Sequence, residues 1–328
     1  METEKMEPIR TIGKYSMIKV LGAGGFAEVY LAINTKTQEK VAIKIIKRDL
    51  TEDSFLIQYI ENELRLITRF DHPNIVKVQD IIYTPDEILI IMEYLPNGDL
   101  QTFVDTKTRI GQTDQLRIAT EILEGINYLH KRGIAHRDIK PANIMFDEKM
   151  HPKIIDFGFC REKSALLNTC CGTQPLMAPE VVMGKTYDGL KADIWSYGVT
   201  IHIMAMLALP FEFQGYTQFI HDMKNNSIKM CIKATGVIGW LVKNSLAFDA
   251  EDRASSDDLL NYIKTKAMAV APQLTVPIVK RANTYTVLQP TSRIISKSPV
   301  VIRSRKIANP LIVKPQTPAP RPEQKVAC

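Results

Sequence analysis

The sequence predicts an α+β fold in two lobes, a small β-rich lobe followed by a larger, mainly helical one. Residues 18 to 90 are mostly short apolar stretches separated by polar or glycine-rich turns, which is typical of strands. From residue 94 to residue 268, stretches with helical periodicity dominate. With 328 residues, 45% of them hydrophobic and 24% charged, the chain can bury a substantial core, which excludes a disordered polymer.

Three strands and one helix are predicted in the first lobe. The strands run from Ile18 to Leu21, from Val29 to Ile33 and from Val41 to Ile46, and turns join them into a meander. Glu52 to Phe70 contains no glycine or proline, and its apolar residues form a rough helical stripe. We therefore expect one helix inserted among the strands.

The second lobe follows a connector at Glu93 to Asn97. Strand-like residues occur at Ile144 to Phe146 and at Ile154 and Ile155. The predicted helices are Gln115 to Lys131, Ala192 to Leu207 and Ser256 to Met268.

A basic, proline-rich tail is predicted after about Met268. Residues 271–328 hold nine of the 18 prolines and no glycine. They also hold ten Lys or Arg against one acid, Glu323, which gives this stretch a net charge of +9. Since the whole chain carries +6, the residues before this stretch carry −3. A solvated, disordered linker is the first interpretation, and docking on acidic partners or on the chain's own acidic body is the second. Nucleic-acid binding is the last interpretation, because Tyr285 is the tail's only aromatic residue.

The cysteines and the N-terminus predict an intracellular protein. The five cysteines are odd in number and form no C-x-x-C pair, which favours a reducing compartment over a disulfide scaffold. The N-terminus lacks a basic region followed by an apolar core, and the longest apolar run, Ile201 to Phe211, is too short to span a bilayer. We expect a cytoplasmic location, with access to the nucleus left open.

A glycine-rich turn and a lysine in the first lobe point to phosphate binding. Gly22 to Val29 reads Gly-Ala-Gly-Gly-Phe-Ala-Glu-Val, and its glycines would let backbone N–H groups approach phosphates. An ordinary hairpin turn is the alternative. Lys44 lies on an apolar strand, where it would either reach solvent or hold phosphates with a carboxylate partner, and the spacing to His72 selects Glu63 over Glu61.

The segment His136 to Asn143, followed by Lys153 to Gly158, carries the decisive chemistry. Two acids, an asparagine and a lysine fall within about twenty residues: Asp138, Asp156, Asn143 and Lys140. Phosphoryl transfer needs oxygen ligands for Mg²⁺, an acceptor for the proton of the nucleophile, and cations near the phosphate charge.

These motifs, in this order, resemble the eukaryotic protein kinase superfamily of serine/threonine type. The resemblance covers Tyr15 to Met268 and implies a two-lobed protein-kinase fold that uses ATP and Mg²⁺ to phosphorylate protein substrates. It divides the chain into an N-terminal extension (1–14), an N-lobe (15–92), a hinge (93–97), a C-lobe (98–268) and the tail (269–328). A kinase-fold pseudoenzyme or scaffold that only binds partners is the alternative, which the intact motif residues disfavour.

The resemblance also implies a role for each site residue. Asp138 would be the catalytic base, Lys140 would neutralise the transferred group, Asn143 and Asp156 would hold Mg²⁺, and Glu63 would hold Lys44. The Lys140-Pro141 pair matches the serine/threonine form of the loop. The implied nucleotide-binding residues are Leu21, Gly22, Ala23, Gly24, Gly25, Phe26, Ala27, Glu28, Val29, Ala42, Lys44, Met92, Glu93, Leu95, Asp99 and Met145.

The resemblance further implies regulation between Asp156 and Glu180. Thr169 stands where many members are phosphorylated by an upstream kinase, and Arg137 could pair with that phosphate. An unmodified threonine in a mobile loop is the alternative. Thr173 is expected beside Asp138 and Lys140 in a placement role.

Two scaffold roles and several departures from the family pattern follow. Asp193 is expected to hold the catalytic loop through its backbone N–H groups, and Glu180 and Arg253 are expected to form a buried ion pair.

Ala27 replaces the third glycine of the phosphate loop, which would stiffen it. Ala142 and Ile203 stand where arginine-directed kinases carry acids, leaving Asp99 as one carboxylate for a basic substrate residue. Phe159-Cys160 is most like the calcium/calmodulin-dependent and autophagy-initiating groups.

Overall fold

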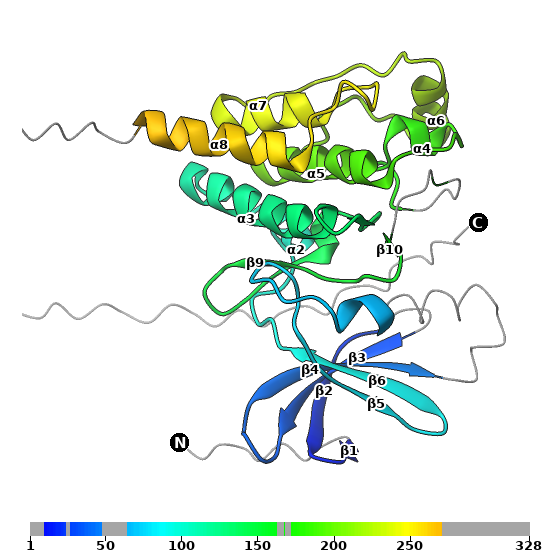
Figure 1. Cartoon of the computed structure of the whole chain (residues 1–328), viewed down its shortest axis with the longest axis vertical. Coiled ribbons are helices and arrows are strands. Elements are labelled where there is room, and N and C mark those ends of the chain that lie inside the picture. Colours follow the sequence, from blue (N-terminus) through cyan, green and yellow to red (C-terminus); the bar gives the residue numbers. More distant parts are fainter. Residues whose placement is uncertain (1–9, 24–26, 48–63, 163–166, 168–171, 271–328) are drawn as a thin grey trace, which may run out of the picture. The chain divides into compact units, whose positions relative to one another are not determined.

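The computed structural model describes residues 10–23, 27–47, 64–162, 167 and 172–270. The chain divides into two units, Met1–Gln273 and Leu274–Cys328, and the second unit, with most of the predicted tail, lies outside the described residues. Within the first unit a β-sheet precedes a mainly helical region in the chain (Figure 1), so the predicted two-lobed α+β fold is confirmed.

A six-stranded antiparallel sheet forms the first lobe, with the strand order β1-β2-β3-β4-β6-β5 (Figure 1). All three predicted strands are present and extend one to three residues further at their ends. The strands are β1 (Arg10–Ile12), β2 (Tyr15–Ala23), β3 (Ala27–Asn34), β4 (Lys40–Lys47), β5 (Val78–Tyr83) and β6 (Glu87–Glu93).

The two-residue period of β4 places Lys44 on one face of the sheet. Val41, Ile43 and Ile45 are buried together in a core with Met17 and Leu89. Because successive side chains point to opposite faces, Ala42, Lys44 and Ile46 share the other face. Of the helix predicted between residues 52 and 70, residues 64–67 are helical and the part before residue 64 lies outside the described residues.

The second lobe is built around a buried helix, α5 (Gly189–Met206). Its side chains pack on all sides, with Trp195, Tyr197, Val199 and Ile201 fully enclosed. The three predicted helices are confirmed with bounds shifted by up to three residues, as α3 (Gln112–His130), α5 and α8 (Ser256–Val270). Four further helices were not predicted: α2 (Leu100–Asp105), α4 (Pro179–Val182), α6 (Tyr216–Lys224) and α7 (Gly236–Ser245).

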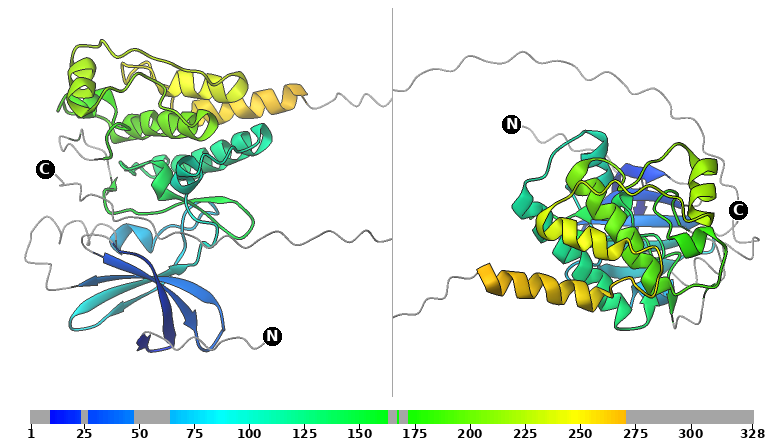
Figure 2. Two further views of the ribbon diagram at one scale, coloured as in Figure 1. Left: turned by 180° about the vertical axis from the view of Figure 1, so that it is seen from behind. Right: turned by 90° about the horizontal axis from the view of Figure 1, so that it is seen from above.

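Helices α3, α5, α7 and α8 lie side by side, as the views from behind and from above show (Figure 2). None of the helices in the described residues is both long enough and apolar enough to cross a membrane.

Two short strand pairs complete the second lobe. The hairpin of β8 (Ile144–Phe146) and β9 (Pro152–Ile154) contains the two predicted strand stretches, although β9 stops before Ile155. In the second pair, β7 (Ile134–Ala135) is antiparallel to β10 (Arg161–Glu162).

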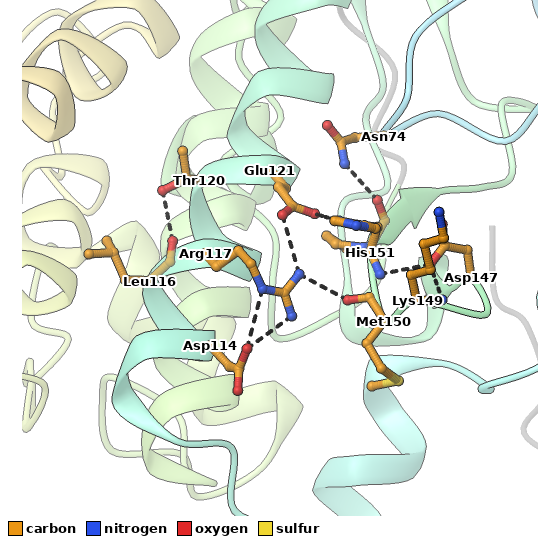
Figure 3. Close-up of polar contacts among 11 residues, drawn as sticks. Asn74, Asp114, Leu116, Arg117, Thr120, Glu121, Asp147, Lys149, Met150 and His151 are labelled. Carbon is orange, nitrogen blue, oxygen red and sulfur yellow. Dashed lines mark hydrogen bonds and ion pairs between the residues drawn. The ribbon is translucent and has the colours of Figure 1, made fainter. Parts of the chain in front are cut away.

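Side chains from α3 fix the turn of the β8–β9 hairpin (Figure 3). Arg117 donates hydrogen bonds to Glu121 Oε1 at 3.2 Å and to the Met150 carbonyl at 3.0 Å. His151 Nδ1 lies 2.9 Å from Glu121 Oε2, and the His151 amide donates to Asp147 Oδ1 at 2.8 Å. The hairpin that leads to Asp156 is therefore anchored at its closed end.

Candidate active site

Asp193, on α5, holds the loop that carries the catalytic motif. Its two carboxylate oxygens accept hydrogen bonds from the backbone amides of His136 and Arg137, each at 2.7 Å. His130 Nε2, on α3, lies 3.1 Å from Asp193 Oδ2. Since two amides and one imidazole converge on a buried carboxylate, the predicted role of Asp193 is confirmed.

Asp138 accepts hydrogen bonds from three side chains. Lys140 Nζ lies 2.6 Å from Asp138 Oδ2, and Asn143 Nδ2 donates to the same oxygen at 2.9 Å. The Thr173 hydroxyl donates to Asp138 Oδ1 at 2.9 Å, and Lys140 Nζ donates to Thr173 Oγ1 at 2.9 Å. The predicted placement of Thr173 is confirmed. The carboxylate is thereby held in one orientation, as positioned proton acceptors are.

Asn143 and Asp156 come together at the open end of the β8–β9 hairpin. Ile144 pairs with Ile154 in the register, and the Ile155 amide donates to the Asn143 carbonyl at 3.0 Å. Asp156, the next residue, has a φ of 63°, in the left-handed region that residues other than glycine rarely adopt. Such a conformation costs about 1–3 kcal/mol and is found most often at functional sites.

These two side chains fit a magnesium ion. The amide oxygen of Asn143 and the carboxylate of Asp156 are hard oxygen ligands, and Asn143 uses its Nδ2 group, not its oxygen, to bind Asp138. Mg²⁺ in proteins is commonly held by one or two such ligands together with phosphate oxygens of the substrate. The donor set is therefore chemically suitable for a metal that also binds a nucleotide.

Lys44 extends from β4 toward the same place. Its Nζ lies 3.9 Å from Asp156 Oδ1, and its side chain is mostly buried. Glu63, its predicted partner, lies outside the described residues. The geometry thus brings the lysine of the first lobe to one of the proposed metal ligands of the second.

The glycine-rich turn joins two paired strands, as its sequence predicts. Gly22 pairs with Val29, and Ala23 with Glu28, across β2 and β3. Leu21 is exposed to solvent, and Ala27 begins β3. The tip of the turn, Gly24, Gly25 and Phe26, lies outside the described residues.

The connector after β6 offers backbone groups for an adenine ring. Ala42 lies opposite Met92 in the register of β4 and β6, and Ala42 and Leu95 are both buried. The Glu93 amide donates to the Lys77 carbonyl at 3.0 Å. Within the part of the chain that the structure describes, the Leu95 amide and carbonyl have no hydrogen-bond partner. An adenine ring could therefore bind Leu95 without displacing an existing bond.

Asp99 and Met145 form an isolated antiparallel bridge below this connector. Asp99 Oδ1 accepts hydrogen bonds from the amide and the hydroxyl of Thr102, both at 2.7 Å, and so caps α2. Sequence reasoning assigned Asp99 to ligand binding and missed this capping role. One of its oxygens is thus already in use, although the carboxylate stays near the connector.

The predicted ion pair between Glu180 and Arg253 is confirmed. Arg253 Nη1 and Nη2 donate to the two oxygens of Glu180 at 2.7 and 3.1 Å. Arg253 also donates to the carbonyls of Lys191 and Ala247. The pair joins α4 to the loop before α8.

Sequence reasoning missed one side chain near the catalytic loop, Tyr187. Its hydroxyl accepts hydrogen bonds from Arg137, fifty residues earlier in the chain. No local pattern could have paired these two residues, because nothing in the spacing of a loop tyrosine records a contact over that distance. Thr169, the predicted regulatory threonine, lies outside the described residues.

Comparisons with known proteins agree with this geometry. Residues 15–264 match the protein kinase domain, and the chain belongs to this family. It is 32% identical over 251 residues to the carbon catabolite-derepressing protein kinase of Saccharomyces cerevisiae, covering 76% of this chain and 40% of that protein. It is 38% identical over 206 residues to CBL-interacting serine/threonine-protein kinase 19 of Arabidopsis thaliana, covering 61% of this chain and 42% of that protein.

A third relative is the maternal embryonic leucine zipper kinase of Xenopus tropicalis. It is 37% identical over 202 residues, covering 60% of this chain and 31% of that protein. The chain thus spans less than half the length of these three relatives.

Proposed function

We propose that the chain is a protein serine/threonine kinase that transfers the γ-phosphoryl group of ATP to hydroxyl groups of protein substrates. One observation carries this proposal: Asp138 is held by Lys140, Asn143 and Thr173 next to the strand end that presents Asp156. This arrangement combines a positioned proton acceptor with a cation and metal ligands, which is the inventory that phosphoryl transfer requires.

The roles of the residues follow from their positions. Asp138 orients the acceptor hydroxyl and takes up its proton, while Lys140 provides positive charge beside it. Lys44 binds the nucleotide phosphates, and Asn143 and Asp156 hold Mg²⁺. When bound, ATP and Mg²⁺ supply the phosphoryl group and the charge that offsets it. Ala42, Met92 and Leu95 line the adenine site.

Serine and threonine are the proposed acceptors. The Lys140-Pro141 pair supports this choice, and the printed name of the Arabidopsis relative describes it as a serine/threonine-protein kinase. The test is incubation with γ-labelled ATP and a mixed protein acceptor, followed by acid hydrolysis and separation of the labelled amino acids. Label on phosphoserine and phosphothreonine supports the proposal. Label on phosphotyrosine alone would refute the acceptor class, and an absence of label would favour a scaffold.

We further propose that phosphorylation of Thr169 by an upstream kinase activates the protein. Arg137 supplies a guanidinium at the start of the catalytic loop that could pair with the phosphate. Thr169→Ala should lower activity several-fold, to roughly a fifth, when the wild type is phosphorylated at this site, since charge-assisted hydrogen bonds would be lost. The measurement is initial rate against a peptide acceptor, with phosphorylation checked by mass spectrometry.

The matched control is Thr265→Ala, an exposed threonine on α8, which should keep the wild-type rate. Full activity of Thr169→Ala under the same conditions would exclude activation through this residue.

A further inference from the structure

Tyr187 lies at a junction between the catalytic loop and the segment that follows Asp156. Arg137 Nη2 and Nε donate hydrogen bonds to the Tyr187 hydroxyl at 2.9 and 3.2 Å. Both residues are buried, with 7% of Arg137 and 4% of Tyr187 exposed. Arg137 Nη1 also lies 3.5 Å from the Phe159 carbonyl, a longer contact. The phenol oxygen is therefore a close acceptor for a buried charge.

The backbone of Tyr187 binds the same segment. The Leu167 amide donates to the Tyr187 carbonyl at 2.8 Å, and the Tyr187 amide donates to the Leu167 carbonyl at 2.9 Å. This two-bond bridge adds to the pairing of Arg161 with Ala135 between β10 and β7, which attaches the same segment nearer to Asp156. A single residue thus holds Arg137 with its side chain and Leu167 with its backbone.

The space around this junction is tightly filled. A Cβ atom at Gly189, two residues after Tyr187, would lie 2.6 Å from Ala135 Cβ and 2.9 Å from Leu167 Cδ1. Such distances are shorter than real contacts allow, so the start of α5 packs directly against β7 and the bridge. Arg137 itself has a φ of 69°, in the left-handed region. Its backbone is thus held in an unfavourable conformation by the bond to Asp193 and by packing.

We propose that Tyr187 is a positioning residue for phosphoryl transfer, which acts by fixing the Arg137 guanidinium beside the catalytic loop and the segment that follows Asp156. The proposal rests on the proposed kinase function. A buried guanidinium needs hydrogen-bond acceptors, because an unsatisfied charged donor carries a large desolvation penalty. With the phenol oxygen in place, two guanidinium nitrogens of Arg137 bind the residue that also binds Leu167. Without it, these two donors lose that acceptor, and the residue that forms the Leu167 bridge loses its hydrogen bonds to the guanidinium.

The variant Tyr187→Phe tests this role, because it removes only the hydroxyl and keeps the ring. We expect kcat/KM for a peptide acceptor to fall about five- to tenfold, within the range expected for the net loss of one hydrogen bond. The KM for ATP should stay unchanged, since the Tyr187 hydroxyl binds Arg137, which is not one of the proposed nucleotide-binding residues.

Tyr197→Phe is the matched control. Tyr197 is a buried tyrosine on α5, its hydroxyl donates to the Ala119 carbonyl at 3.0 Å, and burial raises the pKa of that hydroxyl. Its loss removes a buried hydrogen bond between α5 and α3 that involves no residue of the catalytic loop. Both variants should lower the free energy of unfolding by about 1 kcal/mol. Only Tyr187→Phe should change the kinetics.

A double-mutant cycle identifies the route of the effect. In an Arg137→Gln background, Tyr187→Phe should have no further effect on kcat/KM, because the hydroxyl acts through the guanidinium. If the two substitutions reduced kcat/KM by independent factors, Tyr187 would act by another route and the proposal would be wrong.

Hydrogen exchange separates this proposal from the kinase function. The backbone amides of residues 167 and 187 should exchange with solvent faster in Tyr187→Phe than in the wild type. In Tyr197→Phe they should exchange at the wild-type rate. If the wild type transfers no phosphate but this difference is present, the kinase function fails and the structural coupling stands. If neither kinetics nor exchange distinguishes Tyr187→Phe from Tyr197→Phe, the hydroxyl has only a structural role and the proposal is overturned.

Discussion

Lys44→Met should lower kcat/KM for ATP at least about 100-fold, the size of effect seen when one preorganised charge donor is removed from an active site. Lys44 Nζ lies 3.9 Å from Asp156 Oδ1, on the face of β4 that it shares with Ala42. Methionine keeps most of the length of the side chain and removes its charge, so the loss mainly reports the electrostatic contribution. Steady-state kinetics at varied ATP and a nucleotide-binding titration measure it.

Lys47→Met is the control for this substitution, because Lys47 is exposed at the end of the same strand. Its kinetics should match the wild type. A Lys44→Met protein with wild-type kcat/KM would show that the lysine binds no phosphate and would contradict its proposed role in phosphoryl transfer.

Arg253→Met should destabilise the fold by about 3–5 kcal/mol, the usual cost of leaving one partner of a buried ion pair without the other. The Arg253 side chain is fully enclosed, and Glu180 is 14% exposed. Substitution also leaves the carbonyls of Lys191 and Ala247 without the donors they have now. Urea unfolding followed by circular dichroism gives the change in free energy.

The double variant Arg253→Met/Glu180→Leu should recover part of this loss, because it also removes the unpaired carboxylate. Recovery should be incomplete, since the hydrogen bonds from Arg253 to the two carbonyls are still lost. Lys264→Met, at an exposed position of α8, should unfold like the wild type. Equal stability of Arg253→Met and Lys264→Met would mean that the ion pair contributes nothing to the fold.

Elements with strong local patterns could be predicted from the sequence. The short apolar run Val41 to Ile46, the helical periodicity of α3 and the long apolar stretch of α5 are local signals, and all three were interpreted correctly. The short helices α2 and α4 were missed because six and four residues are too few for helical periodicity to appear. The pairing of β7 with β10 was also missed, because it involves only two residues in each strand and joins segments about 26 residues apart.

The same limit applies to the site. Order and spacing of the motifs identified Asp138, Asn143 and Asp156, because these residues lie close together in the chain. The capping role of Asp99 and the contact of Tyr187 with Arg137 depend on tertiary packing, which spacing does not record. The catalytic, metal-binding, nucleotide-binding and regulatory roles of the site residues, Glu63 and Thr169 included, stay predictions, as does the subgroup assignment.

The most direct test of the central claim is phosphoryl transfer from labelled ATP to a protein acceptor by the wild type and by Asp138→Asn. Asparagine keeps the shape of the side chain but cannot take up the proton of the acceptor hydroxyl. We predict transfer by the wild type and a loss of about 100- to 10,000-fold in kcat for Asp138→Asn, the range of general base catalysis, with nucleotide affinity unchanged. Transfer by the wild type that does not exceed transfer by Asp138→Asn would contradict the assignment of this site as a kinase active site.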